Sequence, residues 1–505
     1  MALSALSLTG YRFGTGDHVT QFPSVLHFFN PQLYQKDLPL QMIFPPYLKV
    51  GLHVVLFSLA RFLHLPVEYV YLFVHLGVFV AFFWVSQRLL GLLRVSPRGV
   101  FWGLVGLVLW AVYAPSVSHF QILVSHLVPY QFVLPLALGA FYLFLRERLW
   151  SASLLLGLSF LVHQQIGLLF FVSLLAGLVL EALFFDLRYL KGLVPLSLPF
   201  SLVFSSYFVF LQTRGSHQGY PWFDATWGEE LLRMVKFRVP HHLLLSYAKP
   251  WEIGFVLLLA LLVLLVLKKE ALRAENRPLR RICFVCLALL GLLGVGSFFS
   301  EVYPLPVALG LYPLRSDVLL RVLSFFLLVY LLDRKFPRPR FLPWPPSPRL
   351  WMLWGVLLVL FFFLGPHVRP FLPPKQVVRL CKCVQEKTPQ RALILAPPAL
   401  KGVRLYCERS VWVSWKAHGL FFSPSVAREW FRRVLLLCQL DEDSACEGRA
   451  CLALCRKNFS ALSEKFLWGL SKGQDIDYLL LEKGKIKGSR PLCETEDLAL
   501  YEVRP

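Results

Sequence analysis

The residue types best suited to chemistry gather near the start of the chain, in the segment YRFGTGDHVTQFP at 11–23. Arg12, Asp17 and His18 stand in a stretch punctuated by glycines, and Asp37 follows in YQKDLP. A carboxylate in such a loop can accept a proton from a hydroxyl group or help to hold a divalent cation. An aspartate of this kind is equally common as a simple turn residue, so both interpretations stay open.

A second group is cationic and lies in KFRVPHHLLLS at 236–246. Lys236, Arg238, His241 and His242 together suit a phosphate or pyrophosphate group. The alternative is that they anchor the chain to anionic lipid. Adjacent histidines point in different directions on a helix, so we do not expect the two histidines to share a metal ion.

The third group is LRSD, which contains Arg315 and Asp317, with Arg321 one turn further along. An ionisable residue within a membrane segment is a functional candidate, although Arg321 could simply pair with Asp317 at i,i+4. Arg315 is the better ligand for an anionic lipid head group. The HQQ at 163–165 could line a polar cavity or cap a helix.

The elements that must position these residues are membrane helices. Hydrophobic residues make up 56% of the chain and charged residues only 16%, and the apolar residues form runs near the ~20 residues that cross a bilayer. These runs are 68–87, 100–115, 129–145, 150–162, 166–185, 190–211, 252–267, 282–299, 317–332 and 350–365. We therefore expect an α-helical polytopic membrane protein with about ten spans.

The net charge of +22 lies mostly in alternate loops, so it does not indicate a nucleic-acid surface. The clusters are Arg88, Arg94 and Arg98; Arg146 and Arg148; Arg188 and Lys191; Lys268, Lys269, Arg273, Arg277, Arg280 and Arg281; and Arg334, Lys335, Arg338, Arg340 and Arg349. The positive-inside rule places these loops in the cytoplasm and both chain ends on the opposite side.

The chain divides into three predicted regions. Residues 1–67 form an extracytoplasmic first loop, and 68–366 form the helical bundle. Within the first loop, 47–65 is apolar, but Lys49, His53, Arg61 and His64 fall near one face, which predicts an amphipathic helix in the outer interface. Residues 2–9 are too short to span a membrane, so either the following hairpin carries this segment across or a first helix precedes it.

The third region, 367–505, has the composition of a small extracytoplasmic α/β domain. Strands are predicted at 392–397, 409–415, 477–482 and 498–503, and helices at 376–386, 424–438 and 459–472. It holds eight of the ten cysteines: Cys381, Cys383, Cys407, Cys438, Cys446, Cys451, Cys455 and Cys493. An even number on the extracytoplasmic side favours disulfides, with free thiols or a zinc site as alternatives.

With these features in place, the chain resembles the GT-C superfamily of membrane glycosyltransferases, and within it a group of largely uncharacterised bacterial members. The resemblance rests on FGTGDHVTQFPSVLHFFNPQLYQKD at 13–37 and on LILAPPALKGVRLYCERSVWVSWKAHGLFFSPSVAREWFRR at 393–433. It also includes the interfacial helix and the terminal α/β domain. The likeness covers nearly the whole chain, but its motifs specify the substrate poorly.

The resemblance implies an enzyme of the bacterial cytoplasmic (inner) membrane that moves a sugar from a polyprenyl-phosphate donor to an envelope acceptor at the outer face. The acidic residue of the superfamily maps onto Asp17, as base or as ligand of Mg²⁺ or Mn²⁺, with His18 beside it. Phosphate ligands map onto Arg238 and His241 or onto Arg315. The alternatives are a lipid or polysaccharide transporter or flippase and a non-catalytic envelope scaffold. The sequence specifies no oligomeric state.

Overall fold

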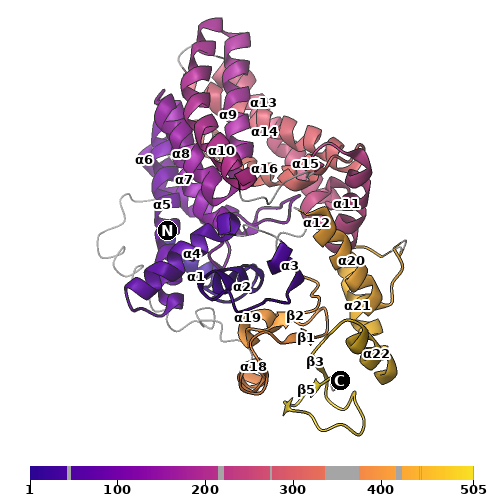
Figure 1. The fold of residues 1–505 in the computed structure, drawn as a ribbon. Coiled ribbons are helices and arrows are strands. Elements are labelled where there is room, and N and C mark those ends of the chain that lie inside the picture. The colour runs from indigo at the N-terminus through magenta and orange to yellow at the C-terminus, as the bar shows by residue number, and fades with distance from the viewer. Residues whose placement is uncertain are drawn as a thin grey trace. The chain divides into compact units, whose positions relative to one another are not determined.

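The computed structural model describes residues 1–42, 47–213, 221–272, 276–335, 375–416, 423–442, 444 and 446–503 (Figure 1). The chain forms two compact units. Unit 1 comprises Met1–Arg12, Pro66–Val209 and His241–Pro370, and unit 2 comprises Phe13–Leu65, Phe210–Pro240 and Phe371–Pro505. Each unit is therefore assembled from segments that lie far apart in the sequence.

Unit 1 is built from helices. They are α1 Ala2–Thr9, α5 Val67–Leu92, α6 Pro97–Tyr113, α7 Pro129–Leu145, α8 Leu149–Val162, α9 Gln164–Phe184, η1 Leu187–Gly192, α10 Leu193–Thr213, α12 Pro240–Leu243, η2 Leu245–Tyr247, α13 Pro250–Val266, η3 Leu267–Ala271, α14 Arg277–Glu301, α15 Pro306–Leu311, η4 Pro313–Arg315 and α16 Ser316–Lys335. Every predicted span from 68–87 to 317–332 falls on one of these helices. The predicted span at 350–365 lies outside the described residues.

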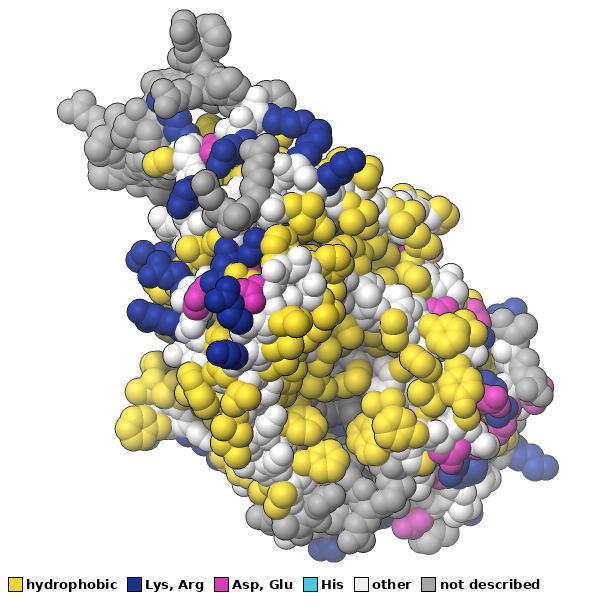
Figure 2. Space-filling model, turned by 90° about the horizontal axis from the view of Figure 1, so that it is seen from above, with side chains coloured by type: hydrophobic (Ala, Val, Ile, Leu, Met, Phe, Trp, Pro, Cys, Tyr) yellow, Lys and Arg dark blue, Asp and Glu magenta, His cyan; other side chains and the backbone are white. Residues whose placement is uncertain are grey.

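Among the described residues, five helical segments are long and apolar enough to cross a membrane: Val67–Leu92, Gln164–Phe184, Leu187–Phe210, Pro250–Ala271 and Arg277–Glu301. Many of their large apolar side chains are exposed, among them Leu257, Leu258, Leu261 and Leu264 on α13. Figure 2 shows hydrophobic side chains covering much of one face, with lysine and arginine side chains gathered along one flank. An apolar surface of this kind suits contact with lipid, and the chain is a helical membrane protein.

A buried charge cluster ties the ends of α9 and α14 together. Glu181 is fully buried and accepts hydrogen bonds from Arg277 Nε at 3.2 Å, Arg280 Nη2 at 3.1 Å and Arg281 Nε at 2.6 Å. Arg277 also pairs with Glu147, which lies between α7 and α8. The α7–α8 connection, the end of α9 and the start of α14 therefore lie together.

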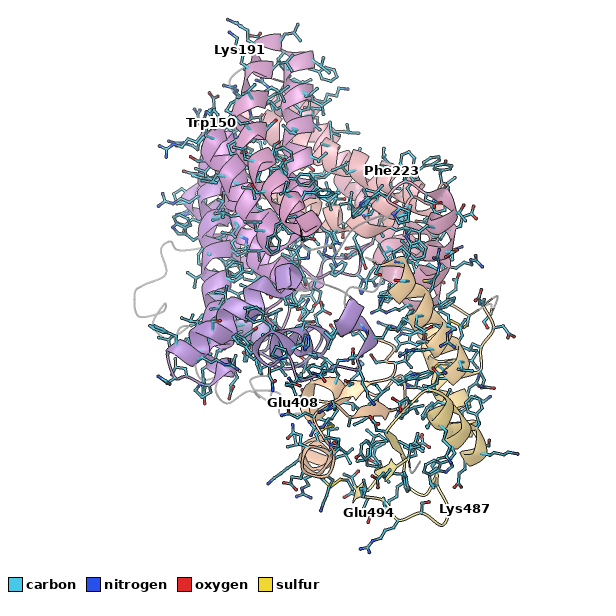
Figure 3. The ribbon with its side chains drawn as sticks, in the orientation of Figure 1. Trp150, Lys191, Phe223, Glu408, Lys487 and Glu494 are labelled. Carbon is cyan, nitrogen blue, oxygen red and sulfur yellow. A yellow bond between two sulfur atoms is a disulfide. The ribbon has the colours of Figure 1, made fainter. Side chains whose placement is uncertain are left out.

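Two further contacts bring the remaining basic loops to the same end of unit 1. The Ser96 N–H, between α5 and α6, donates to Asp333 of α16 at 2.8 Å. Near the same end of α16, Tyr330 Oη lies 3.5 Å from Glu270 Oε2 of η3, just before α14. Trp150 marks this end in Figure 3. The described residues of the predicted basic clusters thus gather at one end of unit 1, which we call the basic end.

Unit 2 combines helices with a small sheet. The helices are α2 His18–Phe29, α3 Leu38–Met42, α4 Tyr47–Phe62, α11 Ala225–Arg238, α18 Lys375–Lys387, α19 Val403–Cys407, α20 Pro424–Cys438, α21 Arg449–Ala461 and α22 Glu464–Gly473. The strands are β1 Leu393–Leu395, β2 Ser410–Val411, β3 Tyr478–Glu482, β4 Cys493–Glu494 and β5 Leu498–Glu502. The four predicted strands are present, whereas β4, α19 and α21 were not predicted.

The sheet has the order β2-β1-β3-β5-β4. β1 runs parallel to β2 and β3, and β5 runs antiparallel to β3 and β4. Its buried core includes Ile394, Val411, Leu480 and Leu500. Because β1 leads to β2 on one side while β3 returns on the other, the carboxyl end of β1 is where such a sheet opens a crevice.

The cysteines of unit 2 are paired. Disulfides join Cys381 to Cys407, Cys383 to Cys493, Cys438 to Cys455 and Cys446 to Cys451. This confirms the disulfide prediction over free thiols and zinc. In the described part of the chain, no cluster of three or more His, Cys, Asp or Glu residues could hold a metal ion.

The amphipathic prediction for 47–65 was wrong in one respect. His53 of α4 is fully buried, and its Nε2 lies 2.6 Å from Gln21 Oε1. Arg61 is exposed and lies 4.0 Å above the Phe29 ring. The reason is that α4 packs on α2, which turns His53 inward while Phe62 stays 77% exposed.

The Glu181 cluster generates a stability prediction. Glu181→Leu leaves three arginines without the anion they share, and breaking a buried ion pair costs about 3–5 kcal/mol. We expect a clear fall in the thermal midpoint of the purified protein in detergent. Glu147→Leu is the matched control, because that side chain is 53% exposed and an exposed pair contributes about 0–1 kcal/mol. Equal midpoints for the two variants would contradict this assignment.

Candidate functional site

The glycine-rich segment of unit 2 forms a tight loop that ends at Asp17. Gly14 and Gly16 have φ values of +71° and +59°, which other residues rarely adopt. The Tyr406 hydroxyl donates to the Gly14 carbonyl at 2.8 Å. Burial raises the pKa of Tyr406, so the hydroxyl stays protonated and can make this bond. The loop that presents Asp17 is therefore fixed by its own glycines and by α19.

Asp17 itself is half-exposed and ion-paired. Its Oδ1 lies 2.7 Å from Lys416 Nζ, and the two side chains are 44% and 42% exposed. Asp17 precedes the first residue of α2, where the helix dipole favours a negative charge. A cavity of about 100 Å³ lies beside it, lined by Gly16, Val19, residues 396–404 and Lys416. An ionised carboxylate at such a cavity can accept a proton from a bound hydroxyl group.

His18 points away from this cavity. Its side chain is fully buried and stacks on the Phe22 ring with centroids 4.4 Å apart. The Gly14 N–H donates to His18 Nδ1 at 3.2 Å. These contacts let His18 hold the loop in shape, whereas Asp17 is the group that faces outward.

Asp37 is fully buried and holds Arg404. Its Oδ2 accepts from Arg404 Nε at 2.7 Å and from the Val411 N–H at 3.1 Å. Arg404 Nη1 donates to Ser414 Oγ at 3.2 Å, and the Tyr34 hydroxyl donates to the Arg404 carbonyl at 2.9 Å. Burial, and then the nearby Glu408 carboxylate, raise the pKa of Tyr34 well above its ordinary value. Asp37 thus joins the loop after α2 to α19 and β2.

Arg238, at the end of α11, also has contacts within unit 2. Its Nε donates to the Trp415 carbonyl at 3.1 Å, and its guanidinium lies 5.3 Å from the Trp430 ring. The neighbouring His241 and His242 belong to unit 1. The predicted cationic group is therefore divided between the two units at this point of the chain.

In unit 1, Arg315 is set among aromatic and polar side chains. Its guanidinium lies 4.6 Å from both the Phe120 and the Tyr312 rings. Its Nη1 lies 2.9 Å from His163 Nε2 and donates to Gln165. His163 caps α9, with its Nδ1 accepting from the Ile166 N–H at 3.3 Å. The capping interpretation of the HQQ segment is confirmed, and the residue that caps the helix also contacts the arginine.

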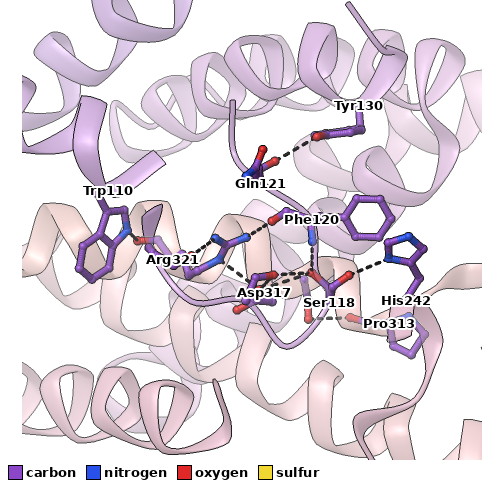
Figure 4. A network of polar contacts seen from close by, with 12 residues as sticks. Trp110, Ser118, Phe120, Gln121, Tyr130, His242, Pro313, Asp317 and Arg321 are labelled. Atoms are coloured by element: carbon purple, nitrogen blue, oxygen red, sulfur yellow. Dashed lines mark hydrogen bonds and ion pairs between the residues drawn. The ribbon is translucent and has the colours of Figure 1, made fainter. Parts of the chain in front are cut away.

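The two adjacent histidines extend this cluster, and Figure 4 shows His242 beside Phe120 and Ser118. His242 stacks on the Phe120 ring at 4.6 Å, and its Nδ1 lies 3.0 Å from the Ser118 carbonyl. The His241 ring lies 4.1 Å from that of His242 and 5.7 Å from that of His119. Arg315 and the histidines therefore meet around Phe120.

Asp317 and Arg321 form a buried network beside this cluster. They form a buried ion pair at 3.1 Å, and Asp317 also accepts from Ser116 Oγ at 2.7 Å. Arg321 donates to the Ala114 carbonyl at 3.2 Å and to the Phe120 carbonyl. Figure 4 shows this network holding the loop that carries Phe120. The predicted i,i+4 pairing is present, which favours the structural interpretation of Arg321.

The residues proposed from sequence fall into two sets. Asp17, His18, Asp37 and Arg238 lie in unit 2, and Arg12, His241, His242 and Arg315 lie in unit 1. Arg12 is exposed, and its backbone N–H donates to the Ser125 carbonyl at 2.6 Å. Sequence reasoning missed Lys416 and Arg404, because no local pattern links them to aspartates nearly four hundred positions away.

Comparisons with known proteins add the following. A model of a domain of unknown function (DUF6798) matches residues 375–437, and no curated protein matches the sequence. Among solved structures, the chain is similar to a cryo-EM structure of a mutant arabinofuranosyltransferase AftD from mycobacteria, with 14% identity and a TM-score of 0.46. The alignment covers 98% of this chain and 42% of that one. The family match contains both Arg404 and Lys416.

The two aspartates should differ in their effect on stability. Asp37→Ala leaves Arg404 buried without its anion, which costs about 3–5 kcal/mol. Asp17→Ala breaks a half-exposed pair with Lys416, and such a pair contributes about 0–1 kcal/mol. We expect thermal unfolding of the full chain in detergent to shift clearly for Asp37→Ala and little for Asp17→Ala. A large shift for Asp17→Ala would make Asp17 a structural residue.

Proposed function

We propose that this protein is a GT-C-like glycosyltransferase that moves a sugar from a polyprenyl-phosphate donor to an envelope acceptor at the outer face of the bacterial cytoplasmic membrane. The observation that carries the proposal is Asp17, an accessible carboxylate held by Lys416 at a cavity of unit 2. The resemblance of 13–37 to the superfamily's first outer loop supports the same residue.

Asp17 acts as the general base of this reaction. It takes the proton of an acceptor hydroxyl as that oxygen forms a bond to the anomeric carbon of the sugar, and the bond from that carbon to the phosphate oxygen breaks. The electron pair leaves with the polyprenyl phosphate. Lys416 is ion-paired with this carboxylate before the acceptor binds, and its flexible, half-exposed side chain can move aside.

Within unit 1, the group best suited to a lipid-linked phosphate is Arg315. A guanidinium matches phosphate oxygens bidentately, and here it lies against Phe120 and Tyr312 with His163 and His242 in the same cluster. Cationic groups of this kind stabilise the charge that develops on the leaving phosphate. Arg238 is a weaker candidate, because its contacts with Trp415 and Trp430 suit packing within unit 2.

We place unit 2 outside the cytoplasm and the basic end of unit 1 at the cytoplasmic side, each on an observation of its own. Four disulfides are typical of proteins in an oxidising compartment, and the basic end of unit 1 suits the cytoplasmic side.

A divalent cation, Mg²⁺ or Mn²⁺, would bind through Asp17 together with substrate phosphate, as such ions commonly do with one or two carboxylates.

Asp17→Asn tests the proposal. Membranes containing the protein are incubated with radiolabelled polyprenyl-phosphate sugars. The radiolabel that is transferred to an acceptor free of the polyprenyl lipid is then measured. Loss of a general base lowers the rate by roughly 10²–10⁴-fold, so we expect transfer to fall by that factor. Lys416→Met is the control, because it removes the partner of Asp17 and leaves the carboxylate in place.

Transfer that survives in Asp17→Asn would remove Asp17 from the site. Absence of transfer with every donor in the wild type would favour a transporter or a scaffold. Thermal unfolding of each variant separates loss of activity from loss of folding.

A further inference from the structure

A second cavity lies at the basic end of unit 1, between α5, α6 and α7. Its volume is about 770 Å³, within the range of about 300–1,000 Å³ that is typical of small-molecule sites. Leu92, Phe101, Leu104 and Val100 provide apolar walls, and the proposed transfer chemistry does not use it. An apolar cavity at the end of membrane helices lies at the depth where acyl chains meet their head groups.

Two arginines stand at this cavity, Arg88 from α5 and Arg146 after α7. Both are exposed, and in the described part of the chain neither is within ion-pairing distance of a carboxylate. Arg277 and Arg281, at the same end, share Glu181 instead. Among the residues that the structure describes, no carboxylate therefore pairs with these two arginines at the cavity.

We infer that this cavity binds an anionic phospholipid of the surrounding bilayer. Its acyl chain packs against Phe101 and Leu104, and its phosphate bonds to Arg88 and Arg146. Tyr142 lines the same cavity and supplies a hydroxyl. A zwitterionic lipid would bring its own cation to two arginines, so the charge at the cavity selects for net negative head groups.

Gly91 offers a way to close the cavity without disturbing its walls. It lines the cavity, and a Cβ added there meets no atom within 4 Å. Leucine also has a higher helix propensity than glycine. Gly91→Leu should therefore fold and fill part of the space that the acyl chain occupies.

The test is native mass spectrometry of the full chain, equilibrated in mixed micelles of phosphatidylglycerol and phosphatidylcholine. We expect the wild type to retain phosphatidylglycerol. Because each arginine near the surface adds to the attraction of an anionic lipid, R88Q/R146Q should lower that retention by about thirtyfold. The matched control, R94Q/R148Q, removes the same charge from the same end outside the cavity and should retain the lipid.

Gly91→Leu should bind less of either lipid, which keeps the inference testable even if the double arginine variant does not fold. Equal retention in R88Q/R146Q and R94Q/R148Q would mean that only general surface charge attracts the lipid, and would overturn the inference. Equal binding of phosphatidylcholine by the wild type would overturn it as well.

Discussion

Lysine and arginine cross the apolar core of a bilayer only at a large cost, and this constraint arranges unit 1. The basic loops, separated along the chain by apolar helices, all end at one side of the unit. They are joined there by the contacts of Glu181 and Asp333. Arg315, the histidines around Phe120 and the Asp317–Arg321 pair lie at the other ends of these helices.

Burial of charge follows one rule in both units, which is that a buried ion has a specific partner. Glu181 has its arginines and Asp37 has Arg404, and each carboxylate is fully buried. These pairs fix the relative positions of elements within a unit, and their removal leaves an uncompensated charge. Asp17 is different, because its pair with Lys416 is half-exposed and lies at a cavity. Lys416 lines that cavity, and a half-exposed ion pair contributes little to stability, which is why we propose Asp17 for the reaction.

The sequence predicted those features that depend on local pattern. Apolar length located the helices of unit 1, alternate loop charge located the basic end, and apolar runs located β1, β3 and β5. Strand β4 was not predicted, because Cys493–Glu494 does not lie in an apolar run. His53 was misjudged because spacing along one helix does not show which face a neighbouring helix covers, and α2 covers that side of α4.

The partners of the candidate residues could not be predicted from local sequence. Asp17 meets Lys416, and Asp37 meets Arg404, only because unit 2 brings a segment before the membrane helices to one after them. Likewise, Arg315 meets His163 through the packing of α9 beside η4. Such pairings depend on tertiary structure, so the sequence indicated the residue types without their contacts.

The orientation of unit 1 is the central claim, and labelling of single introduced cysteines tests it most directly. Lys191→Cys lies at the basic end, and Val302→Cys follows α14 at the opposite end, where the side chain is 69% exposed. In intact cells, a membrane-impermeant maleimide should label Val302→Cys. It should label Lys191→Cys only after the membrane has been permeabilised. Labelling of Lys191→Cys in intact cells, with Val302→Cys protected, would contradict the orientation on which the account rests.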